Sequence, residues 1–330
     1  MMKKVAVIGA GAWGTTLAKV AAENGFPVML WAHEAEVVES IAKRHANEHF
    51  LEGVSLPESI RATNDIADAV DGAGLIILAV PSPFFRDVVK KTAKAMEGAD
   101  KGCIALSVVK GLEQGSLLTM SQVASEEFGS KAIVAVLSGP NHAAEVSRNM
   151  PSATVVAGKE KPALETIRKT LGNGYFRIFL HDDPVGVEIC GAVKNIAAIA
   201  IGVCDALGFG DNAKGSVITL GLTEMARIGR VYGAKRSTCY GLAGVGDLVA
   251  TAFSKHSRNR FFGEQLGKGK TVEEISKLMK GSIAEGTKAV KAVYELSVTK
   301  KLDLPLAREI YRVIYEGKEL KGAIKAIISL

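Results

Sequence analysis

The chain has 330 residues, of which 48% are hydrophobic and 23% are charged. It is long enough to bury a sizeable core and too long for one small domain, so two domains are expected. Lysine and arginine exceed aspartate and glutamate by 41 to 35, without a basic run or interleaved aromatic residues. This mild excess favours small anionic ligands, such as phosphorylated metabolites, over nucleic acid. No apolar run reaches transmembrane length, so no membrane span is expected.

The cysteines are far apart and have no Cys-x-x-Cys or Cys/His spacing, so no structural metal is expected. Their surroundings are mostly apolar, which is typical of reduced core thiols and indicates a cytoplasmic, reducing compartment. They are Cys103, Cys190, Cys204 and Cys239.

The first predicted element is a β-branched strand in "KKVAVIGAGAWG", which ends in G-x-G-x-x-G. A helix in "TTLAKVAAENG" and a second strand in "PVMLWAH" follow, and this βαβ order favours dinucleotide binding over an ordinary glycine turn. Gly9 would permit the tight turn, Gly11 the close approach of a pyrophosphate, and Gly14 the contact between helix and strand. The same glycines argue against a signal peptide here.

Further strands are predicted in "GLIILAVPS", "CIALSVVKGL", "AIVAVLSGP", "SATVVAG" and "FRIFLHDD". Near-continuous apolar strands separated by helical segments predict an α/β fold, with a doubly wound, mostly parallel sheet of the Rossmann type. Ligands of such sheets bind beyond the carboxyl ends of the strands. Candidate positions there, for which turn chemistry is the alternative, are Pro81, Ser82, Lys110, Gly111 and 138–141.

The residues at the end of the second strand indicate which dinucleotide cofactor is bound. Many NAD enzymes carry an acidic residue there for the ribose 2′-hydroxyl, whereas this chain has Trp31, Ala32 and His33 before Glu34. Nothing there obviously repels a 2′-phosphate, so NADPH is favoured and NADH is an accepted alternative. His33 would contact the phosphate or the ribose, or would be a surface histidine.

The carboxyl half has helical patterns. The first runs from Pro184 to about Leu207, before Gly208. The boundary is therefore expected near Asp183, with a dinucleotide-binding domain over 1–183 and a helical substrate domain over 184–330.

One lysine stands out in this first helix. The only charges between Pro184 and Leu207 are Glu188, Lys194 and Asp205, and no carboxylate lies one turn from the lysine. Lys194 is then paired with a distant acid, extended to solvent, or kept for chemistry in a dry cleft, where desolvation and a nearby cation would lower its pKa for acid–base work. Coordinates that show its nitrogen locked to an acid, or facing bulk solvent on the far side, would overturn the catalytic interpretation.

The same region resembles the substrate-domain signature of bacterial NAD(P)-dependent glycerol-3-phosphate dehydrogenases. The similarity includes "GAVKNIAAIAIGVCDALGFGDNAKGSVITLGLTEM", and it extends through blocks that follow in the family's order over nearly the whole chain. These blocks are "GAGAWGTTLA", "LWAHE", "VPS", "VVKGLE", "SGPNHAAE", "GLAGVGDL", "SRNRFFG", "IAEG" and "LPLAREIYRVIYEGK". The resemblance implies two domains, a homodimer, and a role in supplying the glycerophosphate backbone of phospholipids.

The resemblance also implies site residues. Lys194 matches the proton-transfer residue, and Lys110 matches a lysine between substrate and nicotinamide. The substrate set is Lys110, Gly139, Lys194, Asn195, Asp247, Ser257, Arg258 and Asn259. The cofactor set is Gly9, Gly11, Ala12, Trp13, Gly14, His33, Lys110, Ala143, Arg258, Ile283 and Glu285. Asn141 stands where the family usually has Ser or Thr, and it is left off the substrate set.

These residue types suit the reduction of dihydroxyacetone phosphate to sn-glycerol 3-phosphate. Lys194 would donate a proton to the developing alkoxide, and Lys110 would stabilise its charge. Arg258 offers a planar donor fork for the phosphate, flanked by Ser257 and Asn259. Asp247 would orient Lys194 or accept from a substrate hydroxyl.

Each assignment has an alternative. Asp247 could cap a helix, "SKHSRNR" could be a solvated basic surface, Lys110 an exposed loop lysine, and Glu285 an exposed helix residue. Two other functions remain open. A β-hydroxyacid dehydrogenase shares the plan but places its asparagine a turn after the lysine, whereas Asn195 is adjacent. A dinucleotide-sensing protein would not need Lys110, Lys194 and Arg258 together.

Overall fold

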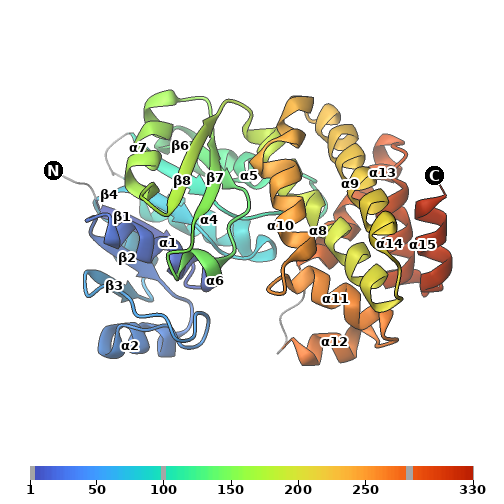
Figure 1. Cartoon of the computed structure of the whole chain (residues 1–330). Coiled ribbons are helices and arrows are strands. Elements are labelled where there is room, and N and C mark those ends of the chain that lie inside the picture. Colours follow the sequence, from blue (N-terminus) through green and yellow to red (C-terminus); the bar gives the residue numbers. More distant parts are fainter. Residues whose placement is uncertain (1–3, 98–101, 280–284, 330) are drawn as a thin grey trace. The chain divides into compact units, whose positions relative to one another are not determined.

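The computed structural model describes residues 4–97, 102–279 and 285–329. By its internal contacts the chain divides into two compact units (Figure 1). The first, here the sheet unit, comprises Met1–Val109 and Leu118–Pro184, and the second, here the helical unit, comprises Lys110–Leu117 and Val185–Leu330. The segment 110–117 groups with the helical unit, which no sequence pattern indicated.

The sheet unit contains an eight-stranded sheet in the order β3-β2-β1-β4-β5-β6-β7-β8. Every neighbouring pair is parallel except β6 and β7, so the predicted mostly parallel, Rossmann-type sheet is confirmed. The strands are β1 (Lys4–Ile8), β2 (Val28–Trp31), β3 (Ile60–Thr63), β4 (Ala73–Leu78), β5 (Cys103–Ser107), β6 (Ala132–Ser138), β7 (Ser152–Ala157) and β8 (Phe176–His181).

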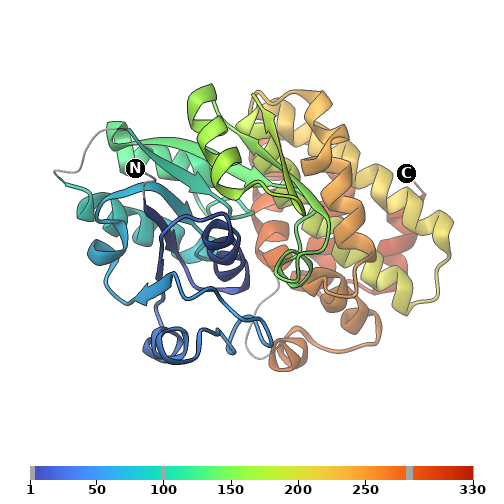
Figure 2. The same ribbon diagram turned by 60° about the vertical axis from the view of Figure 1, so that its left-hand side comes forward.

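Helices cover both faces of this sheet. In β1, Val5 and Val7 belong to one buried cluster and Ala6 and Ile8 to another, because successive side chains point to opposite faces. The first cluster includes residues of α1 (Ala12–Glu23), α2 (Ala35–Arg44) and α7 (Lys161–Leu171), and the second includes residues of α3 (Ile66–Val70), α4 (Phe85–Ala95) and α5 (Met120–Phe128). Figure 2 shows the strands between these two layers of helices. The sheet is therefore doubly wound.

The sequence analysis missed β3. Its four residues, IRAT, have no long apolar run, and only Ile60 is buried. The segment is a strand because it pairs in parallel with β2, with Ile60 opposite Val28 and Thr63 opposite Trp31. The segment is therefore a strand because of its hydrogen bonds to a neighbouring strand, and its local composition does not indicate this.

The helical unit is built around α8 (Pro184–Ala206), which begins at the proline that the sequence indicated. Every residue from Gly186 to Cys204 is buried, as expected for a helix that is apolar on all sides. Residues of α8 share one buried cluster with residues of other helices of this unit (Figure 1). These are α9 (Asp211–Val231), α10 (Asp247–Phe253), α11 (Arg258–Gly267), α12 (Val272–Leu278), α13 (Glu285–Lys300), α14 (Pro305–Glu316) and α15 (Leu320–Ile328).

Within the described residues, α8 is the one helix long and apolar enough to cross a membrane, and it is buried inside its unit. Its burial is typical of the core helix of a globular domain. The four cysteines are buried and are in the thiol form, which confirms the expected core thiols.

A buried carboxylate joins α9 to α14. Glu224 is 1% exposed and accepts hydrogen bonds from the backbone amides of Leu306 and Ala307, at 2.6 and 3.1 Å. These amides belong to the first turn of α14, where backbone donors lack helical partners. Burial raises the pKa of Glu224 to about 7, because it outweighs the two amide donors and the charge of Arg227, while Asp303 acts in the same direction as burial.

This pKa predicts that the folded protein loses stability as the pH rises from about 5 to 8. Below about pH 7 the native carboxyl holds its proton while the unfolded one, with a pKa near 4.3, has released it, so raising the pH favours unfolding until the native group also ionises. The expected loss is about 3 kcal/mol, measured by urea unfolding across the window. Glu224→Gln should be less dependent on pH than the wild type, and equal slopes for the two proteins would contradict this assignment.

Candidate functional site

The predicted glycine turn lies between β1 and α1 in the sheet unit. Gly9 has a φ of +118°, a conformation that side chains rarely adopt, and an added Cβ would lie 2.8 Å from the carbonyl carbon of Ala79. A Cβ on Gly14 would lie 1.9 Å from the carbonyl oxygen of Gly9. Glycine is therefore required at both positions by the backbone packing.

Gly11, the remaining glycine of the motif, has more open surroundings. A Cβ on Gly11 would meet no atom within 4 Å, so protein packing does not require glycine there. Gly11 is the N-cap of α1, no side chain caps this terminus, and the first turn has no acidic residue. An uncapped helix start beside open space fits the phosphate groups of a dinucleotide, which bind free amides and the positive end of the helix dipole. Thus the chain's own geometry fits the cofactor that the motif predicts.

The two glycines give opposite predictions for alanine substitutions. Gly14→Ala should reduce stability by about 1–3 kcal/mol, because the new methyl group overlaps the Gly9 carbonyl. Gly11→Ala should leave stability within about 0.5 kcal/mol of the wild type and still weaken dinucleotide binding, since its methyl group occupies the space open to the ligand. Thermal unfolding and a titration of NADPH fluorescence measure the two effects. If Gly11→Ala binds NADPH as the wild type does, the pyrophosphate does not lie there.

The other predicted residues of the sheet unit have varied surroundings. Trp13 is partly buried, and its ring meets that of Phe176 edge to face, with 6.1 Å between the ring centroids, so it also packs against the core. His33 is exposed, and Ala143 is the first residue of α6 (Ala143–Val146). Gly139 has a φ of +148°. Asn141 donates through Nδ2 to Thr154 Oγ1 at 3.2 Å, so its amide has a bond within the sheet unit.

Lys194 lies in the middle of α8 and has a carboxylate partner. Its Nζ is 2.8 Å from Oδ1 of Asp247 and 2.5 Å from Oγ1 of Thr251, and its side chain is 6% exposed. This is the distant ion pair that the sequence left open. The sequence analysis treated a nitrogen locked to an acid as contrary to catalysis, but it also expected Asp247 to orient Lys194, so a catalytic proposal must account for this ion pair.

Asp247 binds a second lysine as well. Its Oδ2 lies 2.7 Å from Nζ of Lys110, whose side chain is 15% exposed. Burial alone would raise the pKa of Asp247, but the charges and hydrogen bonds of the two lysines outweigh burial and lower it. Two ammonium groups therefore share one ionised carboxylate, and this cluster has a formal net charge of +1. Lys110 is no exposed loop lysine, so that alternative is wrong.

Asp247 is placed by the start of α10. It is the first residue of the helix, the N-cap is Gly246, and no side chain caps this terminus. The capping alternative for Asp247 is therefore wrong. Thr251 lies one turn later on α10, where its hydroxyl is 3.2 Å from Oδ1 of the aspartate. The sequence analysis missed Thr251, although the i, i+4 spacing from Asp247 would have indicated a shared helix face.

Two glycines bring α11 against α8. A Cβ on Gly202 would lie 2.0 Å from the carbonyl oxygen of Arg260, and one on Gly263 would lie 1.9 Å from that of Ile199. This close approach places Asn259 of α11 beside Asn195 of α8, with Nδ2 of Asn259 donating to Oδ1 of Asn195 at 2.8 Å.

The amide of Asn195 is notable because its Nδ2 is buried and has no hydrogen-bond partner in the described part of the chain. Oδ1 of Asn259 accepts from the backbone amide of Gly286 at 2.9 Å. Buried polar groups are normally satisfied, so the unpartnered donor of Asn195, the residue that follows Lys194 in the sequence, suits a ligand oxygen or a water.

The segment predicted to grip phosphate contains both buried and exposed residues. Ser257 is the N-cap of α11, and its hydroxyl accepts from the amide of Arg260 at 3.2 Å. Arg258, the first residue of α11, is exposed. The alternative of a solvated basic surface fits Lys255, His256 and Arg258, which are exposed, whereas Ser257 and Asn259 are buried. Glu285 is the first residue of α13, and Ile283 lies outside the described residues.

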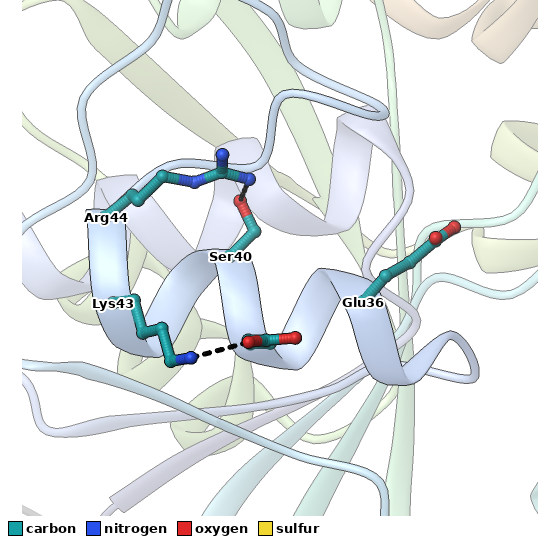
Figure 3. A pocket seen from close by; sticks show the side chains of 5 residues that line it. Glu36, Ser40, Lys43 and Arg44 are labelled. Carbon is teal, nitrogen blue, oxygen red and sulfur yellow. Dashed lines mark hydrogen bonds and ion pairs between the residues drawn. The ribbon is translucent and has the colours of Figure 1, made fainter.

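A surface pocket in the sheet unit is a different feature (Figure 3). One face of α2 lines it, and the charged groups there are two acids and two bases. Lys43 pairs with Glu39 at 2.6 Å, and Arg44 donates to Ser40 at 3.0 Å. The pocket includes no predicted site residue and has no excess charge to attract an anion.

The doubly wound sheet with its glycine turn is typical of dinucleotide-binding proteins, and the helical unit adds two lysines that share a buried carboxylate. Comparison with known families agrees. Residues 4–164 match the model of the NAD-dependent glycerol-3-phosphate dehydrogenase N-terminus, and residues 183–325 match that of its C-terminus. The chain belongs to the NAD-dependent glycerol-3-phosphate dehydrogenase family, and it is therefore an oxidoreductase that uses NAD(P).

Individual proteins are similar over nearly the whole chain. Glycerol-3-phosphate dehydrogenase (NAD(P)+) of Bacillus velezensis is 42% identical over 99% of this chain and 94% of its own. That of Chlorobium phaeobacteroides is 42% identical over 97% of this chain and 96% of its own. The crystal structure of glycerol-3-phosphate dehydrogenase from Coxiella burnetii is 35% identical, with a TM-score of 0.94 and 99% of both chains covered.

Proposed function

We propose that this protein reversibly reduces dihydroxyacetone phosphate to sn-glycerol 3-phosphate, with Lys194 as the proton donor and acceptor. The observation that carries the proposal is the buried cluster in which Lys194 and Lys110 share Asp247. The cofactor, when bound, supplies or accepts the hydride at carbon 2 of the substrate. What the chain itself must supply is a proton for the alkoxide oxygen and positive charge around it.

The ion pair of Lys194 is compatible with this role. A single carboxylate divided between two ammonium groups neutralises only one of them, so the cluster keeps a formal charge of +1 for a developing alkoxide. Asp247 and Thr251 hold the amine of Lys194 in one place, which favours transfer because the donor must be within hydrogen-bond reach of the substrate oxygen. In the reverse direction the same nitrogen would take the proton from the alcohol.

The asparagines extend the site. The unpartnered Nδ2 of Asn195 would donate to a substrate oxygen, and Asn259 holds the Asn195 side chain by the bond to its Oδ1. Arg258 and Ser257, at the start of α11, would bind the phosphate, where free amides and the helix dipole also favour an anion.

The test of the proposal is the oxidation of NADPH, followed by absorbance, with dihydroxyacetone phosphate and with a panel of 2- and 3-oxoacids. We expect turnover with the phosphorylated ketone. Turnover with an oxoacid alone would favour a β-hydroxyacid dehydrogenase, and cofactor binding without oxidation would favour a sensor. The same assay with NADH tests our proposal that NADPH is preferred, for which the support is the absence of an acidic residue before Glu34 at the end of the second strand.

Arg258→Lys should raise the KM for dihydroxyacetone phosphate roughly tenfold, about 1.4 kcal/mol of binding, with a smaller change in kcat. Lysine keeps the charge but loses the planar fork that binds two phosphate oxygens at once. Steady-state kinetics measure the change, and Lys255→Arg, at an exposed neighbouring position, is the control. An unchanged KM would place the phosphate elsewhere.

We also propose a homodimer, a cytoplasmic location, and a role in supplying glycerophosphate for phospholipids. The support for the dimer and the lipid role is the family membership, and the support for a reducing compartment is the set of buried cysteine thiols. Light scattering of the purified protein tests the dimer.

A further inference from the structure

The segment 110–117, here called the strap, belongs to the helical unit although the chain on either side of it belongs to the sheet unit. It follows β5 and carries Lys110 at its first position. How this segment is attached therefore decides where the second lysine of the cluster is held.

The strap has apolar anchors in the helical unit. Leu112 is 5% exposed and belongs to the buried cluster formed by α8 and its neighbours, and Leu117 packs against the same cluster. Between them the chain turns, with the amide of Leu117 donating to the carbonyl of Glu113 at 2.9 Å.

The end of the strap is held in an unusual conformation. Leu117 has a φ of +59°, in the left-handed region that side chains other than those of Gly, Asn and Asp seldom adopt. Such a conformation persists where surrounding contacts impose it. One such contact is a hydrogen bond of 2.7 Å from the hydroxyl of Tyr232 to the carbonyl oxygen of Leu117.

Tyr232 is well placed to hold Leu117 in this backbone conformation. It is the C-cap residue of α9, so its backbone is held by the end of a long helix, and its ring packs against the same cluster as Leu117. Its hydroxyl thus links α9 to the strap at one end, while Lys110 links the strap to Asp247 at the other.

From these contacts we infer that Tyr232 is a positioning residue, which holds the strap so that Lys110 stays bonded to Asp247. The inference rests on the proposed function in so far as it concerns catalysis. Lys110, Asp247, Lys194 and Thr251 all belong to the helical unit.

The test compares Tyr232→Phe, which removes only the hydroxyl, with the wild type. We expect amide hydrogen exchange of 110–117 to become about fivefold faster, as for the loss of one hydrogen bond, and kcat to fall by a similar factor. Because Lys110 lowers the pKa of Asp247, a looser Lys110 should also shift the acid limb of the kcat profile to higher pH. A residue that only adds stability would not move that limb.

Tyr175→Phe is the matched control. It removes a phenol hydrogen bond of 2.6 Å to Glu23 in the sheet unit, and it should change neither strap exchange nor the pH profile. Unchanged exchange at 110–117 in Tyr232→Phe would overturn the inference, as would a fall in kcat with the acid limb in its wild-type place. If the wild type does not reduce the phosphorylated ketone, the proposed function fails, and the exchange measurement alone still decides whether Tyr232 holds the strap.

Discussion

Lys194→Ala is expected to lower kcat for dihydroxyacetone phosphate reduction by roughly 100-fold or more, the range of general acid–base catalysis. The affinity for NADPH should be nearly unchanged, because the lysine belongs to the helical unit and the glycine turn to the sheet unit. Asp247 keeps Lys110 as a partner in this variant, so the carboxylate is not left without a cation. Steady-state kinetics and a fluorescence titration of NADPH are the measurements.

The variant Lys194→Arg distinguishes the electrostatic role of Lys194 from its role in proton transfer. The guanidinium retains the positive charge next to Asp247 but does not release a proton near neutral pH, so it should remain strongly impaired. Lys214→Ala is the control, since this lysine also pairs with acids of the helical unit, but with Asp205 and Asp211 instead of Asp247. Near-normal turnover of Lys194→Ala would remove Lys194 from the mechanism, and full activity of Lys194→Arg would leave it only an electrostatic role.

Local patterns were sufficient for most of the sheet unit. The apolar strands of four to seven residues and the glycine turn can be predicted because each depends on residues that are close together in the sequence. The structure adds the reason why glycine is required at Gly9 and Gly14, which is the close packing of backbone around them. The strand β3 was missed because its ladder with β2, and no local pattern, makes it a strand.

Long-range contacts decided what the sequence could not. The lysine in the apolar helix was visible, but its partner is 53 positions away, and the second lysine of the cluster is 137 positions from the same aspartate. No periodicity connects such residues. The assignment of 110–117 to the helical unit depends likewise on Leu112, Leu117 and Tyr232, which meet only in the folded chain.

Asp247→Asn is expected to destabilise the protein by about 3–5 kcal/mol, the cost of removing one partner from a buried ion pair. The amide has nearly the same shape as the carboxylate, so packing is preserved while two ammonium groups lose their shared counter-charge. Lys194, whose side chain is 6% exposed, has little access to water in compensation. Urea unfolding at pH 7 measures the change, and kcat should fall together with it because the amine of Lys194 is no longer held.

The pH dependence gives an independent check. The pKa of Asp247 is lower in the folded protein than its ordinary value near 3.9, so its stabilising contribution is present above that value and is lost as the pH falls through the folded pKa. Asp247→Asn should therefore approach the wild type in stability only in strong acid. Adding Lys194→Met to Asp247→Asn should restore part of the stability at pH 7, because one uncompensated buried charge is then removed. If the single variant unfolds as the wild type does, the carboxylate does not neutralise the lysines, and the charge balance proposed for the site is wrong.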